Sequence, residues 1–431
     1  MPNKFIINGG NPLFGTINVL GSKNAALPIL AATLLTHERC RISNLPLVLD
    51  VFEMLNILEQ MGSNIQWISP RSIDIENKEI NISRLDSDAL NKMRASILLL
   101  GPLLARFGKV ERMRYPGGCS IGARPIDTHL EAFSDLGATI IPGKKFFSVK
   151  MPPAPKRRAI VTLKEFSVTA TENILSFLSA VPIKSQIKIA ACEPHVRDLA
   201  KFLRKMGARI SGDGTSTINI QGYRRLGGAA HRISPDYVEA GTFLIAPLVC
   251  GGRVRIRNVN PSDLDFVIKK LVSSGADIKL SPQDNSIEVK AEFPGAGIGG
   301  KRMVMENVQS LPHPGIPTDL QSVFSVLATQ TEGATLIHEP LYEKRLSCIK
   351  ELNKMGAKSK ICDPHRAIVW GPVVLKGSKV SSYDLRGGAA LVIAGLGASG
   401  TTIIGNIEHV ERGYEDLGGR LRTLGADIKK I

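Results

Sequence analysis

A pattern of apolar and polar positions recurs six times along the chain. Each copy contains a segment rich in Ala, Gly, Ser and larger apolar residues, followed by a short run typical of a β-strand. Because small side chains let neighbouring backbones approach closely, we expect each segment to form a helix that is buried on all sides. The six segments are residues 24–35, 93–108, 170–180, 238–249, 319–330 and 387–398.

An amphipathic segment follows in each copy and ends at a glycine. Its polar face indicates an exposed helix. Glycine adopts a left-handed conformation without strain, and this conformation closes a helix at its C-terminus before the next strand begins. The glycines recur at intervals of 68 to 81 residues, and they are Gly62, Gly137, Gly207, Gly275, Gly356 and Gly425.

The six copies predict the fold class. Each copy reads as a helix, a strand, a second helix and two strands over about seventy residues. Six copies predict an α/β protein with helices inside and sheets outside, arranged as a two-domain inside-out α/β barrel. We expect an N-terminal lobe of residues 23–231, and a C-terminal lobe of residues 232–431 that also takes the first strand within residues 1–22.

The composition fits a globular chain with more than one domain. Of its 431 residues, 43% are hydrophobic and 22% are charged. The longest apolar stretch, Ala25 to Leu35, is about half as long as a membrane span and contains a proline. The N-terminus has no charged segment followed by an apolar one, as a secretory signal would have. We therefore expect a soluble, cytoplasmic protein without membrane contact.

The spacing of the cysteines and the net charge limit the metals and partners that the protein is expected to bind. The six cysteines lie far apart, with no CxxC pair and no cysteine–histidine spacing typical of zinc, which favours reduced thiols and no metal. A net charge of +16 is compatible with anionic substrates or with a polyanion such as nucleic acid. The basic clusters are short and scattered, and only 5% of residues are aromatic, so we expect no nucleic-acid partner.

The segment Tyr115 to Asp127 carries the strongest local signal for chemistry. Three glycines surround Cys119, so the backbone can approach a ligand closely there. Arg124 and Pro125 are expected to begin the next helix, with proline in its favoured first turn. Positive charge from Arg124 and from the helix start favours a thiolate at Cys119 and the binding of anions. The alternative interpretation is a small apolar cysteine in a turn.

Three of the predicted inner helices begin with charged residues. Lys23 and Asn24 open the first, Asp319 opens the fifth and Arg386 opens the sixth. If these helix starts converge, their free backbone amides and the two cations form a site for phosphate and carboxylate groups. Asp319 would then be the single carboxylate there and an obvious proton acceptor. Taken alone, Asp319 could be an ordinary N-cap and Lys23 a surface charge.

Two further arginines are candidates for the same site. Arg94 lies inside an otherwise apolar helix, where a guanidinium group needs a partner. Arg345 follows the strand of the fifth repeat, at a position equivalent to the loop beyond Cys119. Its alternative interpretation is a solvated charge at a helix start.

These residues resemble a known family. The motifs are similar to the enolpyruvyl transferases, in the branch that acts on UDP-N-acetylglucosamine, and the cysteine loop is specific to that branch. The resemblance implies transfer of the enolpyruvyl group of phosphoenolpyruvate to the 3-hydroxyl of the sugar with release of phosphate, without metal or organic cofactor. It implies the first committed step of peptidoglycan synthesis. The motifs are SKNAALPILAATLL, PGGCSIGARPID, VEAGTFLIA, PHPGIPTDLQ, LRGGAALVIAG and ERGYEDL.

The resemblance also implies an anion pocket. Lys23, Arg124 and Arg386 would hold phosphoenolpyruvate. Arg94 and Arg345 would support the pocket around it.

Roles in proton transfer and sugar binding are implied in the same way. Asp319 would accept the proton of the sugar hydroxyl. Cys119 would deliver a proton to the methylene carbon or bond transiently to the enol unit. Asn24 would orient the sugar and Leu341 would touch it. The residues implied at the uridine end are Pro125, Ile126, Asp127, Thr128, Ser167 and Val168.

Three alternatives stay open. The first is a low-activity or regulatory paralogue of the same family, because a fold does not guarantee activity. The second is an RNA-directed protein related to RNA 3'-phosphate cyclases, which are built on related repeats. The third is the shikimate branch of the family, which has no use for a reactive thiol in the Cys119 loop.

Overall fold

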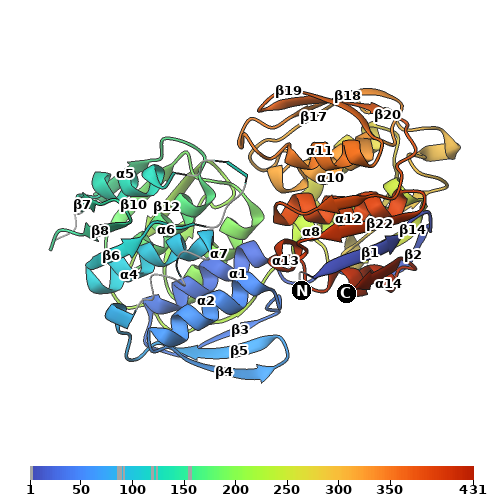
Figure 1. Cartoon of the computed structure of the whole chain (residues 1–431). Helices are drawn as coiled ribbons and strands as arrows, with labels where there is room; N and C mark the ends of the chain where they lie inside the picture. The colour runs from blue at the N-terminus through green and yellow to red at the C-terminus, as the bar shows by residue number, and fades with distance from the viewer. Residues whose placement is uncertain (1–2, 85–89, 91–92, 118–120, 123–124, 154–157) are drawn as a thin grey trace. The chain divides into compact units, whose positions relative to one another are not determined.

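The computed structural model describes residues 3–84, 90, 93–117, 121–122, 125–153 and 158–431. The chain forms two compact units. The first unit contains Met1–Leu20, Ser120–Ala123 and Pro235–Ile431, and the second contains Gly21–Cys119 and Arg124–Ser234. Each unit is drawn in Figure 1 with its own layers of helices and strands.

Six inner helices form the centres of the two units, as the repeats predict. In the second unit, α1, α6 and the pair η3–α4 pack against one another, and in the first unit α8, α10 and α12 do so. Every residue of α8 is buried, which its small and apolar side chains explain. The inner helices are α1 (Lys23–Ala32), η3 (Arg94–Leu99) with α4 (Leu100–Phe107), α6 (Val168–Ser179), α8 (Tyr237–Cys250), α10 (Thr318–Ala328) and α12 (Leu385–Gly397).

The predicted helix at 93–108 differs from a single α-helix because another side chain enters it. The amide of Asn173 lies between Ile97 and Gly101, whose C=O and N–H would pair in a regular α-helix. Asn173 Nδ2 donates to Ile97 O at 2.8 Å, and Asn173 Oδ1 accepts from Gly101 N at 2.7 Å. The insertion separates the 3₁₀ turn η3 from α4.

The glycines that end the predicted outer helices all adopt positive φ, between 90° and 112°, which confirms the expected left-handed closure. At Gly62, for example, the amide donates to Glu59 O and the next amide, of Ser63, donates to Leu58 O. The same pair of bonds recurs at the other five glycines and defines a Schellman motif. The outer helices are α2 (Leu49–Gln60), α5 (Asp127–Asp135), α7 (Pro194–Lys205), α9 (Asp265–Ser273), α11 (Ser347–Lys354), α13 (Glu408–Glu411) and α14 (Leu417–Arg422).

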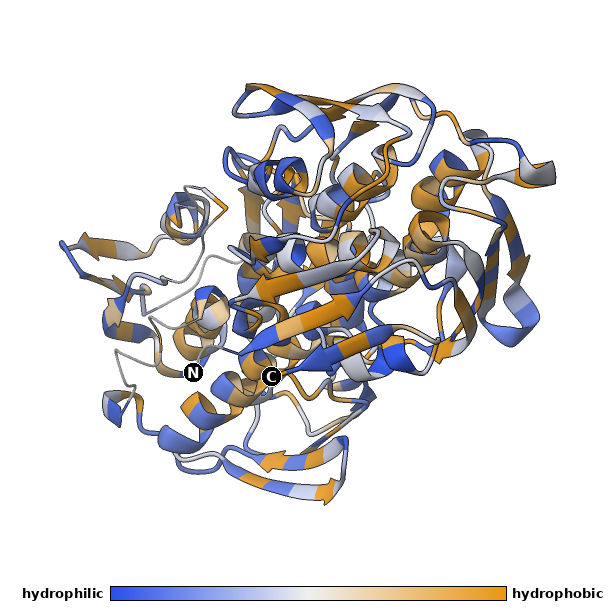
Figure 2. Cartoon of the chain, turned by 45° about the vertical axis from the view of Figure 1, so that its right-hand side comes forward, coloured by the Kyte–Doolittle hydropathy of each residue, from blue (hydrophilic) through white to orange (hydrophobic). Residues whose placement is uncertain are grey.

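The described strands form six sheets, three in each unit, which confirms the mixed α/β class. Each four-stranded sheet contains one parallel pair followed by two antiparallel pairings. Hydrophobic and hydrophilic residues alternate along the strands, so each sheet packs one face on the helices (Figure 2).

In the first unit the sheets are β21 (Lys379–Ser381), β22 (Thr401–Gly405), β1 (Lys4–Asn8), β23 (Asp427–Lys430); β15 (Asp277–Ser281), β16 (Ser286–Ala291), β14 (Gly252–Arg257), β2 (Leu13–Asn18); and β17 (Asn307–Gln309), β18 (Gly333–His338), β20 (Arg366–Gly371), β19 (Lys358–Asp363). In the second unit they are β13 (Ala230–Arg232), β3 (Cys40–Ser43), β5 (Ser72–Glu76), β4 (Asn64–Ser69); β11 (Arg209–Ser211), β12 (Thr217–Gln221), β10 (Lys184–Lys188), β9 (Arg158–Thr162); and β6 (Lys109–Arg114), β8 (Phe146–Lys150), β7 (Thr139–Pro142).

Short 3₁₀ turns complete the described helices. They are η1 (Thr33–Leu35), η2 (Ile82–Arg84), η4 (Pro261–Leu264), η5 (Pro282–Asp284) and η6 (Ile298–Gly300).

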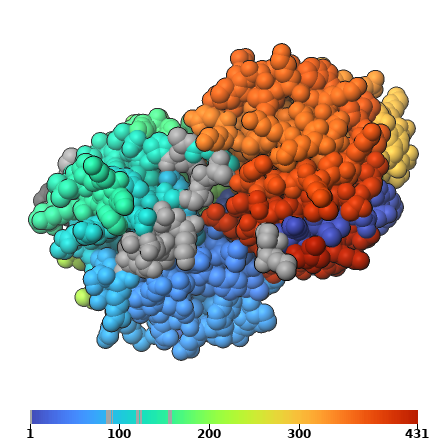
Figure 3. All heavy atoms as spheres, in the orientation of Figure 1, coloured from blue at the N-terminus to red at the C-terminus, as the bar shows by residue number. Residues whose placement is uncertain are grey.

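Strands from the start of the chain complete sheets of the C-terminal repeats. β1 lies between β22 and β23, so Lys4–Asn8 appear among residues from the end of the chain (Figures 1 and 3). β2 pairs in parallel with β14, and β13 pairs in parallel with β3 in the other unit. Asn258 and Asn44 follow β14 and β3 with φ of 55° and 58°. Their amides donate to Val19 O and Ile233 O, just beyond β2 and β13, and so hold the chain where it leaves each unit.

Two features are absent from the described part of the chain. No helix there is both long and apolar enough to cross a membrane. No group of three or more His, Cys, Asp or Glu side chains there could hold a metal ion.

Candidate functional site

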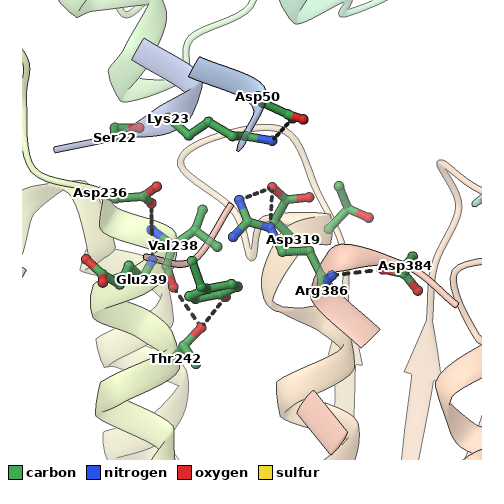
Figure 4. A network of polar contacts seen from close by, with 12 residues as sticks. Ser22, Lys23, Asp50, Asp236, Val238, Glu239, Thr242, Asp319, Asp384 and Arg386 are labelled. Atoms are coloured by element: carbon green, nitrogen blue, oxygen red, sulfur yellow. Dashed lines mark hydrogen bonds and ion pairs between the residues drawn. The ribbon is translucent and has the colours of Figure 1, made fainter. Parts of the chain in front are cut away.

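Asp319 lies at the start of α10 between two arginines of the first unit. Its Oδ1 accepts from Arg345 Nη2 at 2.5 Å, and its Oδ2 lies 3.0 Å from Arg386 Nε and 2.9 Å from Arg386 Nη2. The side chain of Asp319 is 25% exposed, whereas those of Arg345 and Arg386 are 4% and 3% exposed. Figure 4 shows the carboxylate facing Arg386. A partly exposed carboxylate is therefore paired with two buried guanidinium groups.

The local structure rules out the alternative interpretations of Asp319 and Arg345. Pro317, and not Asp319, is the N-cap of α10, so Asp319 is not an ordinary cap. Arg345 is buried, so it is not a solvated charge at the start of α11. Its Nη1 also lies 3.5 Å from Asp384 Oδ1. The expectation that Asp319 is the single carboxylate of the site is therefore wrong, because Asp384 faces the same guanidinium group.

Arg386 is held by its own helix and by an aromatic ring. Asp384 caps α12 by accepting from the amides of Arg386 and Gly387, each at 2.9 Å. The guanidinium carbon lies 5.1 Å from the centroid of the Tyr414 ring. Tyr414 shares a hydrogen bond of 2.8 Å with Thr242 Oγ1, which fixes the ring.

Charge and burial act in opposite directions on Arg386. Burial is the largest single effect and would lower its pKa, but Asp319, Tyr414 and Asp236 together outweigh burial and raise the pKa above the ordinary value. Its buried Nη1 has no hydrogen-bond partner within the described residues. A buried donor without a partner costs free energy that an added anion would recover. The cluster thus offers one partly exposed carboxylate and one guanidinium N–H suited to an anion.

Lys23 is the first residue of α1 in the second unit. Ser22 caps this helix, accepting from Ala25 N at 3.4 Å. Lys23 Nζ lies 3.0 Å from Asp50 Oδ2 of α2, and the two side chains are 14% and 9% exposed (Figure 4). Lys23 is therefore not a solvated surface charge. Asn24, the next residue, is half-buried.

Arg94 joins the two ends of the segment that contains the cysteine loop. Its Nη1 donates to Pro116 O at 3.4 Å and its Nη2 donates to Pro125 O at 3.2 Å. These backbone oxygens explain how an arginine is tolerated at the start of an apolar helix. The expected position of Pro125 in the first turn of the next helix is wrong, because α5 begins at Asp127 with Ile126 as its cap and Pro125 precedes it.

The starts of α5 and α6 lie side by side in the second unit. Thr128 Oγ1 donates to Glu165 Oε1 at 2.8 Å, just before α6. His129 Nε2 and Thr169 Oγ1 are 3.0 Å apart. Ser167 caps α6 by accepting from Ala170 N at 3.4 Å, and Val168 is the first helical residue. The residues expected at the uridine end therefore lie at two adjacent helix starts, although Ile126 is only 4% exposed.

The remaining expected residues divide into two groups. Leu341 is 45% exposed, and its amide donates to Glu339 Oε1 at 3.1 Å. Cys119 and Arg124 lie outside the described residues. Between them, Ile121 belongs to the first unit, and its carbonyl oxygen accepts from Lys344 N at 3.1 Å.

Four supporting residues were missed by the sequence interpretation. Asp384, Thr318, Glu339 and Tyr414 hold the two arginines or their neighbours. Only Asp384 had a local signal, because an Asp directly before an apolar helical segment is a favoured N-cap. The other three contact the site through tertiary structure.

Comparison with known proteins gives consistent similarities. A family model described as EPSP synthase (3-phosphoshikimate 1-carboxyvinyltransferase) matches residues 7–421. A UDP-N-acetylglucosamine 1-carboxyvinyltransferase of Coxiella burnetii is 42% identical over 429 residues, covering 100% of this chain and 96% of that protein. A protein of the same description from Xylella fastidiosa is 39% identical, with 100% of both chains covered.

Solved structures show the same fold at lower identity. The enolpyruvyl transferase NikO from Streptomyces tendae matches with a TM-score of 0.86 at 21% identity, covering 100% of this chain and 99% of that one. EPSP synthase from Acinetobacter baumannii matches with a TM-score of 0.73 at 20% identity, covering 100% of both chains.

Proposed function

Because this chain belongs to the EPSP synthase family of carboxyvinyltransferases, we propose that it transfers the enolpyruvyl group of phosphoenolpyruvate to the 3-hydroxyl of UDP-N-acetylglucosamine, with release of phosphate. The choice of acceptor rests on full-length relatives that carry this activity in their names at 38–42% identity. The reaction would be the first committed step of peptidoglycan synthesis, in the cytoplasm of a bacterium.

The observation that carries the proposal is the position of Asp319 between Arg345 and Arg386. Addition of a hydroxyl group to an enol phosphate needs a base at the hydroxyl oxygen, an acid at the methylene carbon and cations around the phosphate. The cluster supplies a base candidate and two cations within one hydrogen-bonded group.

The anion pocket would consist of Lys23, Arg124 and Arg386, with Arg94 and Arg345 in supporting positions. Helix starts at α1 and α12 add partial positive charge to the side chains of Lys23 and Arg386. The unpartnered Nη1 of Arg386 supports a direct contact with the substrate anion.

Asp319 would take the proton of the sugar hydroxyl as its oxygen bonds to the second carbon of phosphoenolpyruvate. In the structure both oxygens of the carboxylate contact guanidinium groups. An anion that binds Arg386 would draw that guanidinium away from Asp319. Substrate binding would therefore leave one carboxylate oxygen to accept the hydroxyl proton.

Cys119 would deliver a proton to the methylene carbon, giving a tetrahedral intermediate that loses phosphate and a proton to form the enol ether. Asn24 and Leu341 would contact the sugar. The starts of α5 and α6 would line the uridine end through residues 125–128, Ser167 and Val168. No metal or organic cofactor would take part.

Phosphate release tests the proposal directly. The protein is incubated with phosphoenolpyruvate and UDP-N-acetylglucosamine, shikimate 3-phosphate or no acceptor. We expect release only with the nucleotide sugar, together with a product heavier by the enolpyruvyl group. Release with shikimate 3-phosphate alone would assign the other branch, and binding of the nucleotide sugar without release would indicate a regulatory paralogue. We expect no nucleic-acid or membrane partner.

A further inference from the structure

Glu339 is a fully buried carboxylate directly after β18, and the proposed chemistry has no direct use for it. Its Oε2 accepts from Ser310 Oγ at 2.6 Å and from Thr318 Oγ1 at 2.8 Å. Its Oε1 accepts from Leu341 N at 3.1 Å. The backbone of Glu339 is fixed too, because its amide donates to His365 O and its carbonyl oxygen contacts His365 Nδ1, each at 2.7 Å.

The first arm of this network leads to the candidate base. A threonine hydroxyl has one proton to donate. Thr318 gives that proton to Glu339, so its oxygen is free to accept from Arg345 Nε at 3.2 Å. Arg345 then donates through Nη2 to Asp319 at 2.5 Å. Glu339 thus holds the Thr318 hydroxyl in the orientation in which its oxygen can accept from Arg345.

The second arm leads to the segment expected to touch the sugar. Leu341 exposes 45% of its surface while its amide is tied to the buried carboxylate. One carboxylate oxygen of Glu339 therefore contacts the base cluster through Thr318, and the other contacts the segment at Leu341.

We propose that Glu339 is a positioning residue that couples the sugar-contacting segment at Leu341 to the base cluster of Asp319 and Arg345. This inference rests on the proposed enolpyruvyl transfer. Displacement of Leu341 by the sugar would be transmitted through one rigid carboxylate to Thr318 and Arg345. The sugar-contacting segment and the base cluster would then both be in position before the hydroxyl proton is removed.

Three variants separate this role from plain stabilisation. In E339Q the side-chain amide can donate to Thr318. The threonine hydroxyl would then point its own proton towards Arg345, where it meets the Arg345 N–H. T318V keeps the shape of the side chain but removes the hydroxyl, so only the first arm is lost. S325A is a matched control in the same helix, because Ser325 is buried and its hydroxyl bonds to Gln321 within α10.

The experiment measures kcat, the KM for each substrate and the melting temperature for every variant. We expect T318V to lower kcat about tenfold, a usual size for losing a positioned group, with the KM for UDP-N-acetylglucosamine within a factor of two. E339Q should lower kcat similarly and raise that KM about fivefold or more. S325A should change only the melting temperature.

The double variant tests the shared path. If Glu339 acts through Thr318, the kcat of E339Q/T318V should be no lower than that of the worse single variant, because residues of one network are not additive. T318S, which restores the hydroxyl, should recover most of the turnover that T318V loses.

The outcomes distinguish the inference from the proposed function. A wild-type protein without phosphate release would refute the function. An active wild type with E339Q kinetics within twofold of it would refute the role of Glu339. A crystal structure of E339Q that keeps the Thr318–Arg345 bond and the Leu341 backbone in place would overturn the inference without any activity measurement.

Discussion

Arg386 contacts a single oxygen of Asp319 through two nitrogens, Nε at 3.0 Å and Nη2 at 2.9 Å, which leaves the other oxygen to Arg345. Both oxygens of the carboxylate are therefore engaged by guanidinium groups in this structure. A substrate anion and Asp319 compete for the same cations.

Replacement of Asp319 by alanine should separate binding from turnover. We expect D319A to lower turnover by about 10² or more, the usual range for a lost acid–base group, while inorganic phosphate binds more tightly because the arginines lose their internal partner. Phosphate release and calorimetric titration with inorganic phosphate measure the two effects. Turnover within a factor of two of wild type would remove Asp319 from the mechanism.

Lys23 and Arg386 should discriminate between the two substrates. R386K keeps the charge but loses the planar, two-nitrogen contact, and K23M loses the charge. We expect each to weaken phosphoenolpyruvate binding about tenfold or more, while UDP-N-acetylglucosamine binding changes less than about threefold. K109M is the control, because Lys109 is 59% exposed and pairs with the exposed Glu111. Equal losses for both ligands would argue against a phosphoenolpyruvate pocket.

Cys119 should be the thiol that reacts first with the epoxide antibiotic fosfomycin, a phosphonate that resembles phosphoenolpyruvate. UDP-N-acetylglucosamine should accelerate the reaction. Peptide mass spectrometry should find one adduct, on the Cys119 peptide. C119D keeps an acid but no nucleophile, so it should resist the drug and retain partial activity.

The other cysteines provide the internal control for this experiment. Burial raises the pKa of Cys40 to about 11 and of Cys250 and Cys348 to about 12, so these thiols stay protonated at neutral pH. Burial also raises the pKa of Cys192. Cys362 is exposed and should react with a general alkylating agent but not with the phosphonate. An adduct on Cys362 with Cys119 unmodified would place the active site elsewhere.

Glu172 of α6 should make the protein less stable as the pH rises. The side chain is fully buried, its Oε1 has no hydrogen-bond partner among the described residues, and burial raises its pKa well above the ordinary value of 4.5. The folded state keeps the proton while the unfolded state releases it above pH 4.5, so each further pH unit lowers the unfolding free energy by about 1.4 kcal/mol until the folded pKa is reached.

E172Q should therefore melt at nearly the same temperature as wild type at pH 4 and at a higher temperature at pH 8. Thermal unfolding across this range measures the difference. A constant difference at all pH values would show that Glu172 does not carry this proton.

Two repeat glycines should respond differently to alanine. Gly207 has a φ of 112° and no atoms within 4 Å of the added Cβ, so G207A should cost about 1 kcal/mol from backbone strain alone. At Gly62 the Cβ would lie 2.4 Å from Glu79 O, so G62A should cost clearly more. Urea unfolding of both variants compares two glycines of the same unit. Equal losses of unfolding free energy would mean that the loop at Glu79 moves to make room for the added Cβ at little cost.

The repeated architecture was predictable because its signals are local. A glycine at the end of each outer helix acts through its own backbone, and small side chains along an inner helix act through adjacent turns. The break between η3 and α4 was not predictable, because Asn173 is 72 residues away from Gly101 in sequence. α5 begins two residues after Pro125, and the contact of Arg94 with the carbonyl oxygen of Pro125 had no signal in the sequence either.

The candidate site likewise combines residues that have a local sequence signal with residues that have none. Charged residues at the starts of inner helices singled out Lys23, Asp319 and Arg386, and all three occupy the first or second helical position. Their partners could not be found in this way. Asp50 pairs with Lys23 from another helix, and Glu339 reaches Arg345 only through Thr318.

The position of β1 in the middle of the last sheet has a consequence for synthesis on the ribosome. β1 emerges long before its partners β22 and β23. The unit that ends at Ser234 can fold during translation, because its described strands have emerged before β22 and β23 are made. In the other unit Lys4–Asn8 must stay unpaired until β22 and β23 have emerged, so chaperones that bind nascent chains would have the apolar residues Phe5, Ile6 and Ile7 to protect during that time.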